Sequence, residues 1–431
     1  MIPRYSKHYS NRKPSAIRTA QISFHTREDK AQIQAINLAI GNVSLPMHPY
    51  LINRMKNLVE NPHFERGIIR YTPTTGQKET IDSFLNIISY EGADISKLNC
   101  LVTDGGSQSM EIMLLGVCGP SSANPIMLLD PAYTNYLEFS KRLSIPIISL
   151  SRSISSFGNF DKLNFVEMES FIKAEKPNGL VVIPFDNPTG QFINQEDLIK
   201  IASICVKNEI WLISDEAYRQ LYYNKESSSS IWKITENDVP NISGFRISIE
   251  SASKVWNACG LRIGAMVTDN MEFYKKAVYE YTANLCANSL GQYIFGALSK
   301  LSHNEMGTWY AKQRKYYFPL MNSFRISLIK EIPGILVSKP SAAIYLVIDF
   351  KNICQPDFDA SDFILYCAKK GKVNIQGQYY TVLFAPMNEF YSGNNNIKTQ
   401  IRIAIVENEN FLKIAPRILS TLYINYTNQN T

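Results

Sequence analysis

The sequence predicts an α/β protein with a large domain, whose mainly parallel central sheet is covered by helices, and a smaller α+β domain. Short apolar runs alternate with amphipathic helical segments between residues 101 and 268. These runs are apolar throughout, as in strands that helices cover on both faces. The chain has 431 residues, which is too many for one ordinary hydrophobic core and indicates two lobes.

The segments before the sheet are expected to be an arm and several helices. Residues 1–36 should form an arm with a helix from Glu28 to Ile36, and the first 27 residues carry basic side chains and no acid. Asn37–Gly41 is a short apolar run closed by glycine. Helices are expected at Pro49–Leu58 and Gln77–Tyr90, the second because its apolar residues recur at helical spacing.

The alternating pattern of strand and helix begins at residue 101. The expected strands are Leu101–Thr103, Ile126–Leu129, Ile145–Leu150, Leu180–Pro184, Ile210–Ser214, Phe245–Ile249 and Ala265–Thr268. The expected helices between them are Ser107–Val117, Tyr136–Leu143 and Glu196–Lys207. Strands that alternate with helices in this way are typical of a parallel sheet.

The remainder of the chain is expected to leave the sheet and form the second lobe. A helix is expected over residues 271–302, and residues 303–431 alternate helices with short strands such as Ile344–Ile348 and Ile401–Ile405. We therefore expect three parts. Residues 1–44 would form an N-terminal arm and part of the small domain, residues 45–302 the large domain, and residues 303–431 the C-terminal small α+β domain.

Composition and charge disfavour several classes of protein. The formal net charge is +6, but the basic residues are scattered, and Lys312, Arg314 and Lys315 favour a solvated or subunit-contacting face over a nucleic-acid groove. The seven cysteines stand singly, which favours reduced thiols in a cytoplasmic protein. The five histidines show no ligand spacing, so no metal is expected. No apolar run is long enough to predict a membrane span.

Polar residues follow five of the expected strands. Because ligands of open α/β sheets bind outside the carboxyl ends of the strands, these residues are expected to share one crevice. In chain order they are Gly105–Gln108, Tyr133, Asn187, Asp215 and Lys254.

Lys254 lies in Ser251–Lys254, just after the expected strand Phe245–Ile249. A lysine at the end of a buried strand is costly as an isolated charge, but not as a deprotonated amine that forms a Schiff base. Ser251 and Arg262 would suit an anion nearby, the serine as a hydroxyl donor and the arginine as a fork of two donors. Taken alone, a lysine at a strand end is more often just a solvated side chain.

Three further motifs each have a chemical and a structural reading. Gly105–Gln108 opens a helix whose free N–H groups and dipole suit a phosphate, or it is a glycine turn with Ser107 as helix cap. Asp215 would be a buried carboxylate that needs a cation such as a pyridinium nitrogen, or a cap of the next helix. Asp186–Gly190 can also be a plain turn.

The order of these motifs is more informative than any one of them. It runs GGSQ, Pro131–Tyr133, NPTG, DEAY at Asp215–Tyr218, and SASK followed by Arg262 eight positions after the lysine. The chain resembles the class I/II pyridoxal-phosphate-dependent aminotransferases of fold type I, in the aspartate aminotransferase superfamily. The resemblance spans Asn37 to Leu412.

The resemblance implies a role for each cofactor-site residue. Lys254 would form the Schiff base with pyridoxal 5'-phosphate and shuttle the proton, and Asp215 would pair with the ring nitrogen. Tyr218 and Asn187 would bond the phenolic oxygen of the ring, and Tyr133 would stack on its face. The phosphate would be held by Gly106, Ser107, Gln108, Ser251 and Arg262.

The resemblance also implies a substrate site and a partner. Arg402 would clamp the substrate α-carboxylate, with Gly41 bringing its backbone close and Asn187 beside it. Tyr71 would reach the phosphate of a neighbouring subunit, which implies a homodimer. No second arginine can be assigned to a side-chain carboxylate, and Ala342–Ala343 replaces the usual glycine pair.

The implied activity transfers the amino group of an L-amino acid, with aspartate or aromatic donors favoured, to a 2-oxo acid such as 2-oxoglutarate by a ping-pong mechanism. Two alternatives keep every cofactor residue: a C–S β-lyase and a cyclopropane-carboxylate-synthase-like enzyme. A non-enzymatic alternative is a regulator or scaffold with a relict cofactor site. The products formed from an amino acid and 2-oxoglutarate separate these possibilities.

Overall fold

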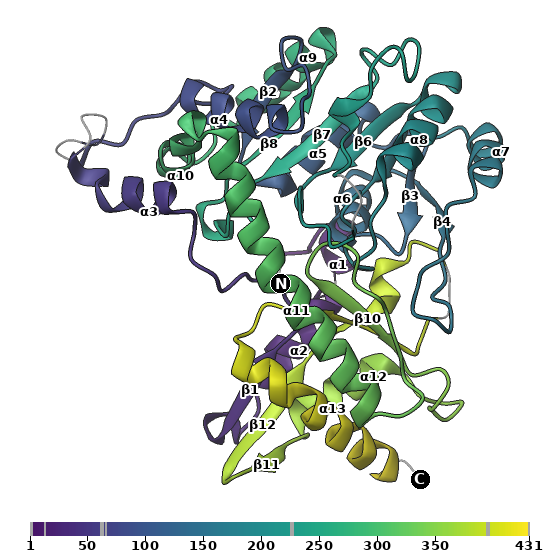
Figure 1. Cartoon of the computed structure of the whole chain (residues 1–431). Coiled ribbons are helices and arrows are strands. Elements are labelled where there is room, and N and C mark those ends of the chain that lie inside the picture. Colours follow the sequence, from purple (N-terminus) through teal and green to yellow (C-terminus); the bar gives the residue numbers. More distant parts are fainter. Residues whose placement is uncertain are drawn as a thin grey trace.

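The computed structural model describes residues 3–12, 14–60, 64, 67–224, 228–393 and 397–429. Among these residues the helices are α1 (Lys7–Ser10), α2 (Ala16–His25), α3 (Pro49–Lys56), α4 (Lys78–Ser89), α5 (Gly106–Val117), α6 (Thr134–Leu143), α7 (Phe165–Glu175), α8 (Gln195–Lys207), α9 (Met271–Tyr281), α10 (Ser289–Phe295), α11 (His303–Glu331), α12 (Ala360–Lys369) and α13 (Glu409–Gln429). Two lobes are visible in Figure 1, with the central sheet in the upper one.

The central sheet of the described chain has seven strands (Figure 1). Their order is β2 (Asn99–Thr103), β8 (Gly264–Thr268), β7 (Arg246–Ser251), β6 (Trp211–Asp215), β5 (Gly179–Val182), β3 (Ile126–Asp130) and β4 (Ile147–Ser151). β8 is antiparallel to both neighbours, whereas β7, β6, β5, β3 and β4 pair in parallel. The predicted α/β class and mainly parallel sheet are confirmed.

The sheet is buried on both faces because alternate side chains enter two different cores. In β3, Met127 and Leu129 join the core beneath α4, α7 and α8, whereas Ile126 and Leu128 join the core beneath α5, α6 and α9. Successive strand residues point to opposite faces, so both sets must be apolar. This explains why the strands appear in the sequence as continuous apolar runs.

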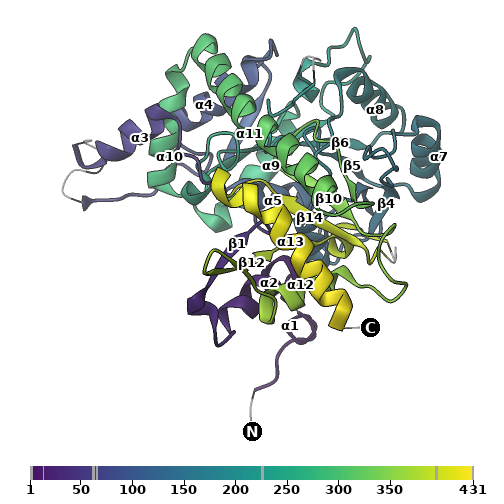
Figure 2. The ribbon, with the colours of Figure 1, turned by 60° about the horizontal axis from the view of Figure 1, so that its bottom comes forward.

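The second lobe contains two small sheets. One is β1 (Ile33–Asn37), β12 (Gln378–Leu383) and β11 (Val373–Ile375); the other is β13 (Ala385–Pro386), β14 (Gln400–Ala404), β10 (Tyr345–Asp349) and β9 (Leu336–Val337). β1 pairs in parallel with β12, so the N-terminal segment lies beside the C-terminal one, as the purple and yellow ribbons of Figure 2 show. The domain boundaries at residues 44 and 302 stay a prediction.

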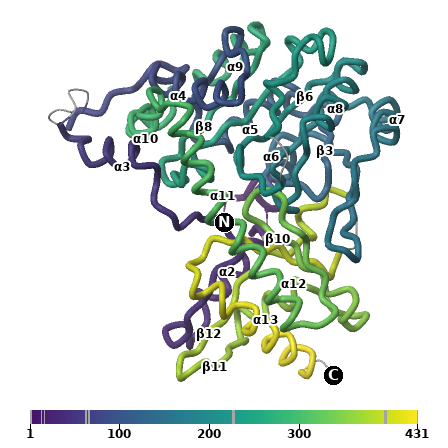
Figure 3. The backbone as a smooth tube through the Cα atoms, in the orientation of Figure 1, coloured from purple at the N-terminus to yellow at the C-terminus, as the bar shows by residue number. Residues whose placement is uncertain are grey.

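α11 connects the two lobes. It begins with a capping box, in which Ser302 and Glu305 satisfy each other's backbone N–H groups, and it continues for 29 residues. Figure 3 traces this green segment from the upper lobe into the lower one. Because one long helix belongs to both lobes, their facing surfaces are held together along its length.

Two helix predictions are wrong. Residues 28–36 do not form a helix: Lys30–Gln32 is a 3-10 turn, and Ile33–Asn37 is β1. Ile33 and Ile36 are three apart, as on a helix face, but pairing with β12 overrides that local pattern. Residues 271–302 are interrupted between α9 and α10, where Leu285 has φ +66° and Asn288 caps the new helix.

None of the helices in the described ranges is both long and apolar enough to cross a lipid bilayer. The same residues bring together no group of three or more histidine, cysteine or acidic side chains that could hold a metal ion.

Candidate active site

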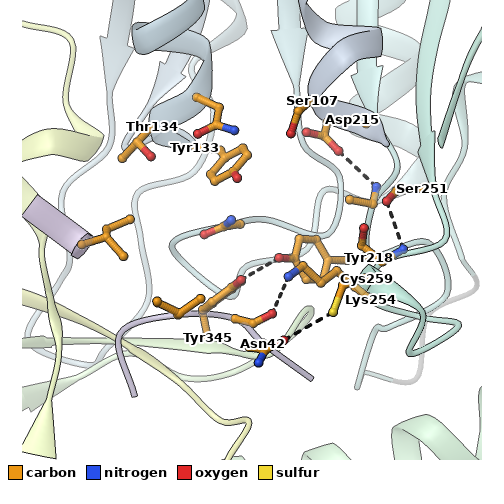
Figure 4. A pocket seen from close by; sticks show the side chains of 18 of the residues that line it. Asn42, Ser107, Tyr133, Thr134, Asp215, Tyr218, Ser251, Lys254, Cys259 and Tyr345 are labelled. Atoms are coloured by element: carbon orange, nitrogen blue, oxygen red, sulfur yellow. Dashed lines mark hydrogen bonds between the residues drawn. The ribbon is translucent and has the colours of Figure 1, made fainter. Parts of the chain in front are cut away.

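A cavity of about 780 Å³ opens at the carboxyl ends of the central strands, between the two lobes. It is lined by residues that the sequence places far apart (Figure 4). The predicted site residues that line it are Gly41, Gly106, Ser107, Tyr133, Asn187, Asp215, Tyr218, Ser251, Lys254, Arg262 and Arg402.

Lys254 lies three residues beyond the end of β7 and is half-buried. Its Nζ donates a hydrogen bond to the carbonyl oxygen of Gly41. A Cβ atom on Gly41 would lie 2.2 Å from the hydroxyl of Tyr345 and 3.4 Å from Lys254 Nζ. A larger residue at position 41 would therefore collide with Tyr345, and this glycine allows the backbone to approach the lysine.

Asp215 ends β6 and is 4% exposed. Its two oxygens accept hydrogen bonds from the Tyr136 hydroxyl at 3.0 Å and the Ala217 backbone N–H at 3.1 Å. Burial raises the pKa of this carboxyl to about 6, although both hydrogen bonds favour the ionised form. Among the described residues no lysine or arginine forms an ion pair with Asp215, so the carboxylate still lacks a cationic partner.

An anion cradle forms where Arg262 meets the N-terminus of α5. Arg262 donates to the carbonyl oxygens of Cys259 at 3.1 Å and Asp104 at 3.5 Å, and pairs with no carboxylate in the part of the chain described. A Cβ atom on Gly105 would lie 2.6 Å from the Arg262 guanidinium, and one on Gly264 would lie 2.5 Å from Gly106 N. The glycines thus admit a guanidinium beside a helix N-terminus, which suits a phosphate.

Arg402, in β14, is a buried cation without an anionic partner among the described residues. It is 2% exposed, donates to Asn187 Oδ1 at 3.0 Å and the Ala39 carbonyl oxygen at 2.5 Å, and leaves Nε without a hydrogen bond. Its guanidinium carbon lies 4.5 Å from the ring centre of Tyr345 and 4.8 Å from that of Phe390. Burying an unpaired charge is costly, so this arrangement suits a carboxylate that enters the cavity.

The model of the family "Aminotransferase class I and II" matches residues 33–418 of this chain. The chain belongs to the class I and II aminotransferases. This match covers both lobes and every residue of the cavity that the sequence predicted, and it confirms the predicted family. The enzyme is a transaminase that acts on an amino acid and a 2-oxo acid, and its cofactor is pyridoxal phosphate.

Curated relatives of this aminotransferase are similar over most of their length. The probable kynurenine–oxoglutarate transaminase BNA3 of Saccharomyces cerevisiae is 23% identical over 410 residues, which cover 90% of this chain and 87% of BNA3. An aspartate aminotransferase of Sulfurisphaera tokodaii is 25% identical over 357 residues, covering 81% and 82% of the two chains.

Solved structures share the fold. The crystal structure of Bna3p from Saccharomyces cerevisiae superposes with a TM-score of 0.79 at 19% identity, covering 98% of this chain and 99% of Bna3p. The kynurenine aminotransferase of Pyrococcus horikoshii, solved in complex with PMP, also superposes with a TM-score of 0.79. The identity is 18%, and the match covers 98% of this chain and 97% of the Pyrococcus chain. At this level of identity the likeness shows the fold.

The residues of the aminotransferase cavity fit pyridoxal phosphate chemically. A primary amine, a buried carboxylate without a cation and a guanidinium at a helix N-terminus match the aldehyde, the ring nitrogen and the phosphate of this molecule. The space that Gly105 leaves beside Arg262 is the clearest sign, because a side chain there would displace the guanidinium.

Two tyrosines of the aminotransferase cavity, Tyr133 and Tyr218, are neutral hydrogen-bonding groups. The hydroxyls of Tyr218 and Tyr345 lie 2.6 Å apart, and their rings meet edge to face. Burial raises the pKa of Tyr133 to about 12, and burial together with Tyr345 raises the pKa of Tyr218. Both phenols therefore remain protonated near neutral pH and can donate to an oxygen of a ligand.

Two of the predicted residues do not line the cavity. The side-chain oxygen of Gln108 accepts hydrogen bonds from the Asp104 backbone N–H at 2.8 Å and from the Tyr281 hydroxyl at 2.9 Å. Tyr71 lines a separate hollow of about 580 Å³ with Arg70 and Tyr293, and is 79% exposed. Its predicted approach to a neighbouring subunit stays a prediction.

Sequence reasoning missed several supporting residues. Tyr136 and Tyr345 contact Asp215 and Tyr218, and Arg152 forms a buried ion pair of 2.8 Å with Asp186, which fixes the turn that carries Asn187. Tyr136 lies three residues after Tyr133, the N-cap residue of α6, and that spacing is the one signal that could have identified it.

Proposed function

We propose that this aminotransferase takes the amino group of L-aspartate or an aromatic L-amino acid and passes it to a 2-oxo acid such as 2-oxoglutarate. Support comes from one observation above all: a single cavity contains Lys254, the unpaired Asp215, Arg262 beside α5, and the unpaired Arg402. Two relatives described above, a probable kynurenine–oxoglutarate transaminase and an aspartate aminotransferase, support these donors.

In this proposal each group has a distinct task in holding the cofactor. Arg262, Ser107, Gly106 and Ser251 would bind the phosphate, whereas Gln108, whose side-chain oxygen accepts from the Tyr281 hydroxyl, lies outside the cavity. Asp215 would keep the ring nitrogen protonated, Tyr218 and Asn187 would donate to the phenolic oxygen, and Tyr133 would lie against the ring. When bound, the cofactor supplies an electron sink for the bonds of the substrate Cα.

The chain's own contribution to the reaction is orientation and proton transfer. Arg402 and Asn187 fix the substrate α-carboxylate, and the backbone at Gly41 approaches the same group. The amine of Lys254, once it no longer holds the cofactor, would remove the proton from the Cα of the amino donor in the first half-reaction and deliver a proton to the Cα of the newly formed amino acid in the second. A ping-pong sequence follows, because one site serves the amino acid first and the 2-oxo acid second.

The proposal extends to assembly and location. We propose a homodimer in which Tyr71 reaches the neighbouring cavity, supported by its exposure beside the residues Arg70 and Tyr293. A cytoplasmic location is supported by seven free cysteines and no disulfide among the described residues. The molar mass in solution tests the first statement, and localisation of the tagged full chain tests the second.

Product analysis tests the reaction. Purified protein with L-aspartate or L-tyrosine and 2-oxoglutarate should yield glutamate and the matching 2-oxo acid. A C–S β-lyase would instead release pyruvate and ammonia from a cysteine conjugate. Absence of glutamate with every donor of a broad amino-acid panel, while cofactor is bound, would contradict the proposal and favour a regulator or scaffold.

A further inference from the structure

One cation of the cavity has no role in the proposed binding of the cofactor or of the α-carboxylate. The charged side chains that line the cavity in the described part of the chain are Arg18, Asp215, Lys254, Arg262 and Arg402. Four of these five residues serve the cofactor or the α-carboxylate. Arg18, on α2, remains.

Arg18 stands in a positive environment at the start of α2. Ser15, at the N-cap position, makes no side-chain capping bond, and the first turn of the helix contains no acidic residue. Ser15, Ile17 and Arg18 all line the cavity. The positive end of a ten-residue helix therefore adds to the charge of the guanidinium at this wall.

Arg18 forms no ion pair with a carboxylate of the described chain. Its guanidinium donates one side-chain hydrogen bond, to the amide oxygen of Gln21 at 3.2 Å, and Gln21 also lines the cavity. An amide oxygen is a neutral partner, and carboxylates bind guanidinium more strongly. Arg18 is thus free to exchange Gln21 for an anion.

The topology brings Arg18 and Arg402 to one side of the cavity. α2 packs against β13, and Ala385 of β13 is the register partner of Arg402 in β14. Neighbouring strands lie about 4.8 Å apart, so the helix is one strand removed from Arg402. In Figure 4 a purple N-terminal segment stands beside Thr134, on the far side of Tyr133 from Lys254.

We propose that Arg18 binds the distal carboxylate of a dicarboxylic substrate, an acidic amino acid or its 2-oxo acid. This inference rests on the proposed function, because it assumes that the α-carboxylate occupies the unpartnered guanidinium of Arg402. Two cations, one on α2 and one on β14 with β13 between them, then hold the two ends of one dicarboxylate. Gln21 and Ser15 supply neutral donors beside the distal end.

This assignment provides the second arginine that the sequence did not reveal. Arg18 lies in a basic arm with no motif around it, and its helix was not predicted. The sheet register and the packing of α2 bring it to the cavity.

The test compares substrates that differ only in the distal carboxylate. L-Glutamate is compared with L-norvaline and 2-oxoglutarate with 2-oxovalerate, in the holoenzyme and in its Arg18→Gln and Arg18→Lys variants. Arg12→Gln is the matched control, because Arg12 lies on the same arm but pairs with Glu138 at 2.6 Å on the surface and does not line the cavity. Binding of the unreactive pair glutarate and valerate is measured by calorimetry.

We expect Arg18→Gln to lower kcat/KM for the dicarboxylic substrates about tenfold to a hundredfold, the range for a lost hydrogen bond to a charged group. The neutral substrates should change less than about twofold, Arg18→Lys should recover part of the loss because the charge is kept, and Arg12→Gln should resemble the unmodified enzyme. Glutarate affinity should fall in parallel with kcat/KM, and valerate affinity should not.

Equal losses for both substrate classes, or no loss for either, would overturn the role of Arg18. Failure of the proposed function looks different: the unmodified protein would form no glutamate from any donor. In that case Arg18-dependent binding of glutarate would still support the inference, and glutarate binding that does not depend on Arg18 would refute it.

Discussion

Asp215 is held at the end of β6 by two neutral donors, the hydroxyl of Tyr136 and the backbone N–H of Ala217. These donors only partly offset the loss of water, so the pKa of the carboxyl stays raised, at about 6. The side chain is therefore poorly suited to the cofactor-free protein and well suited to a protonated ring nitrogen. The buried carboxyl of Asp215 thus lowers the stability of the cofactor-free protein and is available to bind the cofactor.

The pH dependence of stability tests this reading of Asp215. In the cofactor-free protein its pKa lies above the unfolded value of 3.8, so its contribution to the free energy of unfolding is present below that value and is lost as pH rises through about 6. Asp215→Asn cannot ionise. We expect the unfolding free energy of the variant, relative to the unmodified protein, to improve by about 2 kcal/mol between about pH 4.5 and 8.

Urea unfolding at the two pH values measures this difference. With cofactor bound, Asp215→Asn should instead have a lower unfolding free energy than the unmodified protein at the higher pH, because Asn cannot form an ion pair with a protonated nitrogen. A difference between variant and unmodified protein that does not change with pH would show that Asp215 is not destabilised by burial.

Much of the site could be predicted residue by residue because parallel strands bring their carboxyl ends together. Lys254, Asp215 and Asn187 lie in the cavity for that reason. Gln108 belongs to the predicted motif Gly105–Gln108, yet its side chain accepts a hydrogen bond from Tyr281, which is 173 residues away in the chain. Arg18 could not be predicted, since contacts across the fold, rather than neighbouring residues, bring it to the cavity, and for Tyr136 the sequence offered only its spacing from Tyr133.

At the scale of elements, the ends of β6 and β7 are tied together beside the cavity. Glu216 follows Asp215, Glu250 precedes Ser251, and Arg219 bonds Glu250 at 2.7 Å and 3.2 Å. Arg219 also pairs with Glu91 and lies 3.6 Å from Glu216. Burial, and then the repulsion of Glu250 and Glu91, raise the pKa of Glu216 to about 8 against the pull of Arg219.

Removing the single cation of this cluster should destabilise the protein strongly. In Arg219→Met three buried carboxylates lose their shared partner, and we expect a loss of about 3–5 kcal/mol in the free energy of unfolding. Arg142→Met is the control: Arg142 pairs with Glu111 at 3.0 Å on the surface, and its loss should cost less than about 1 kcal/mol. Similar losses in both variants by urea unfolding would refute a special role for the cluster.

Prediction of the elements succeeded where periodicity is strong and failed where pairing decides. The central strands were found because both of their faces are buried. The prediction of a helix over Glu28–Ile36 is wrong, because β12 supplies the hydrogen bonds of a strand to Ile33–Asn37. α7 was missed, as only Met168 and Ile172 of its residues are buried.

For the whole molecule, the cavity exists because two lobes meet along α11. The central sheet contributes Asp215, Lys254 and the cradle at Arg262, and the second lobe contributes Tyr345 and Arg402. The order of motifs along the chain predicted this meeting, although neither lobe's packing was visible in the sequence. In the proposed function, the cofactor would thus be held by residues of the central sheet's lobe, and the α-carboxylate of the substrate by Arg402 of the other lobe.

The most direct test is to find the lysine to which the cofactor is attached. The purified holoenzyme is reduced with borohydride, digested and analysed by mass spectrometry. We predict the mass of the reduced cofactor on the peptide that contains Lys254, and a Lys254→Ala protein that carries no such mass and forms no glutamate. Attachment to another lysine, or near-native transamination by Lys254→Ala, would contradict the account.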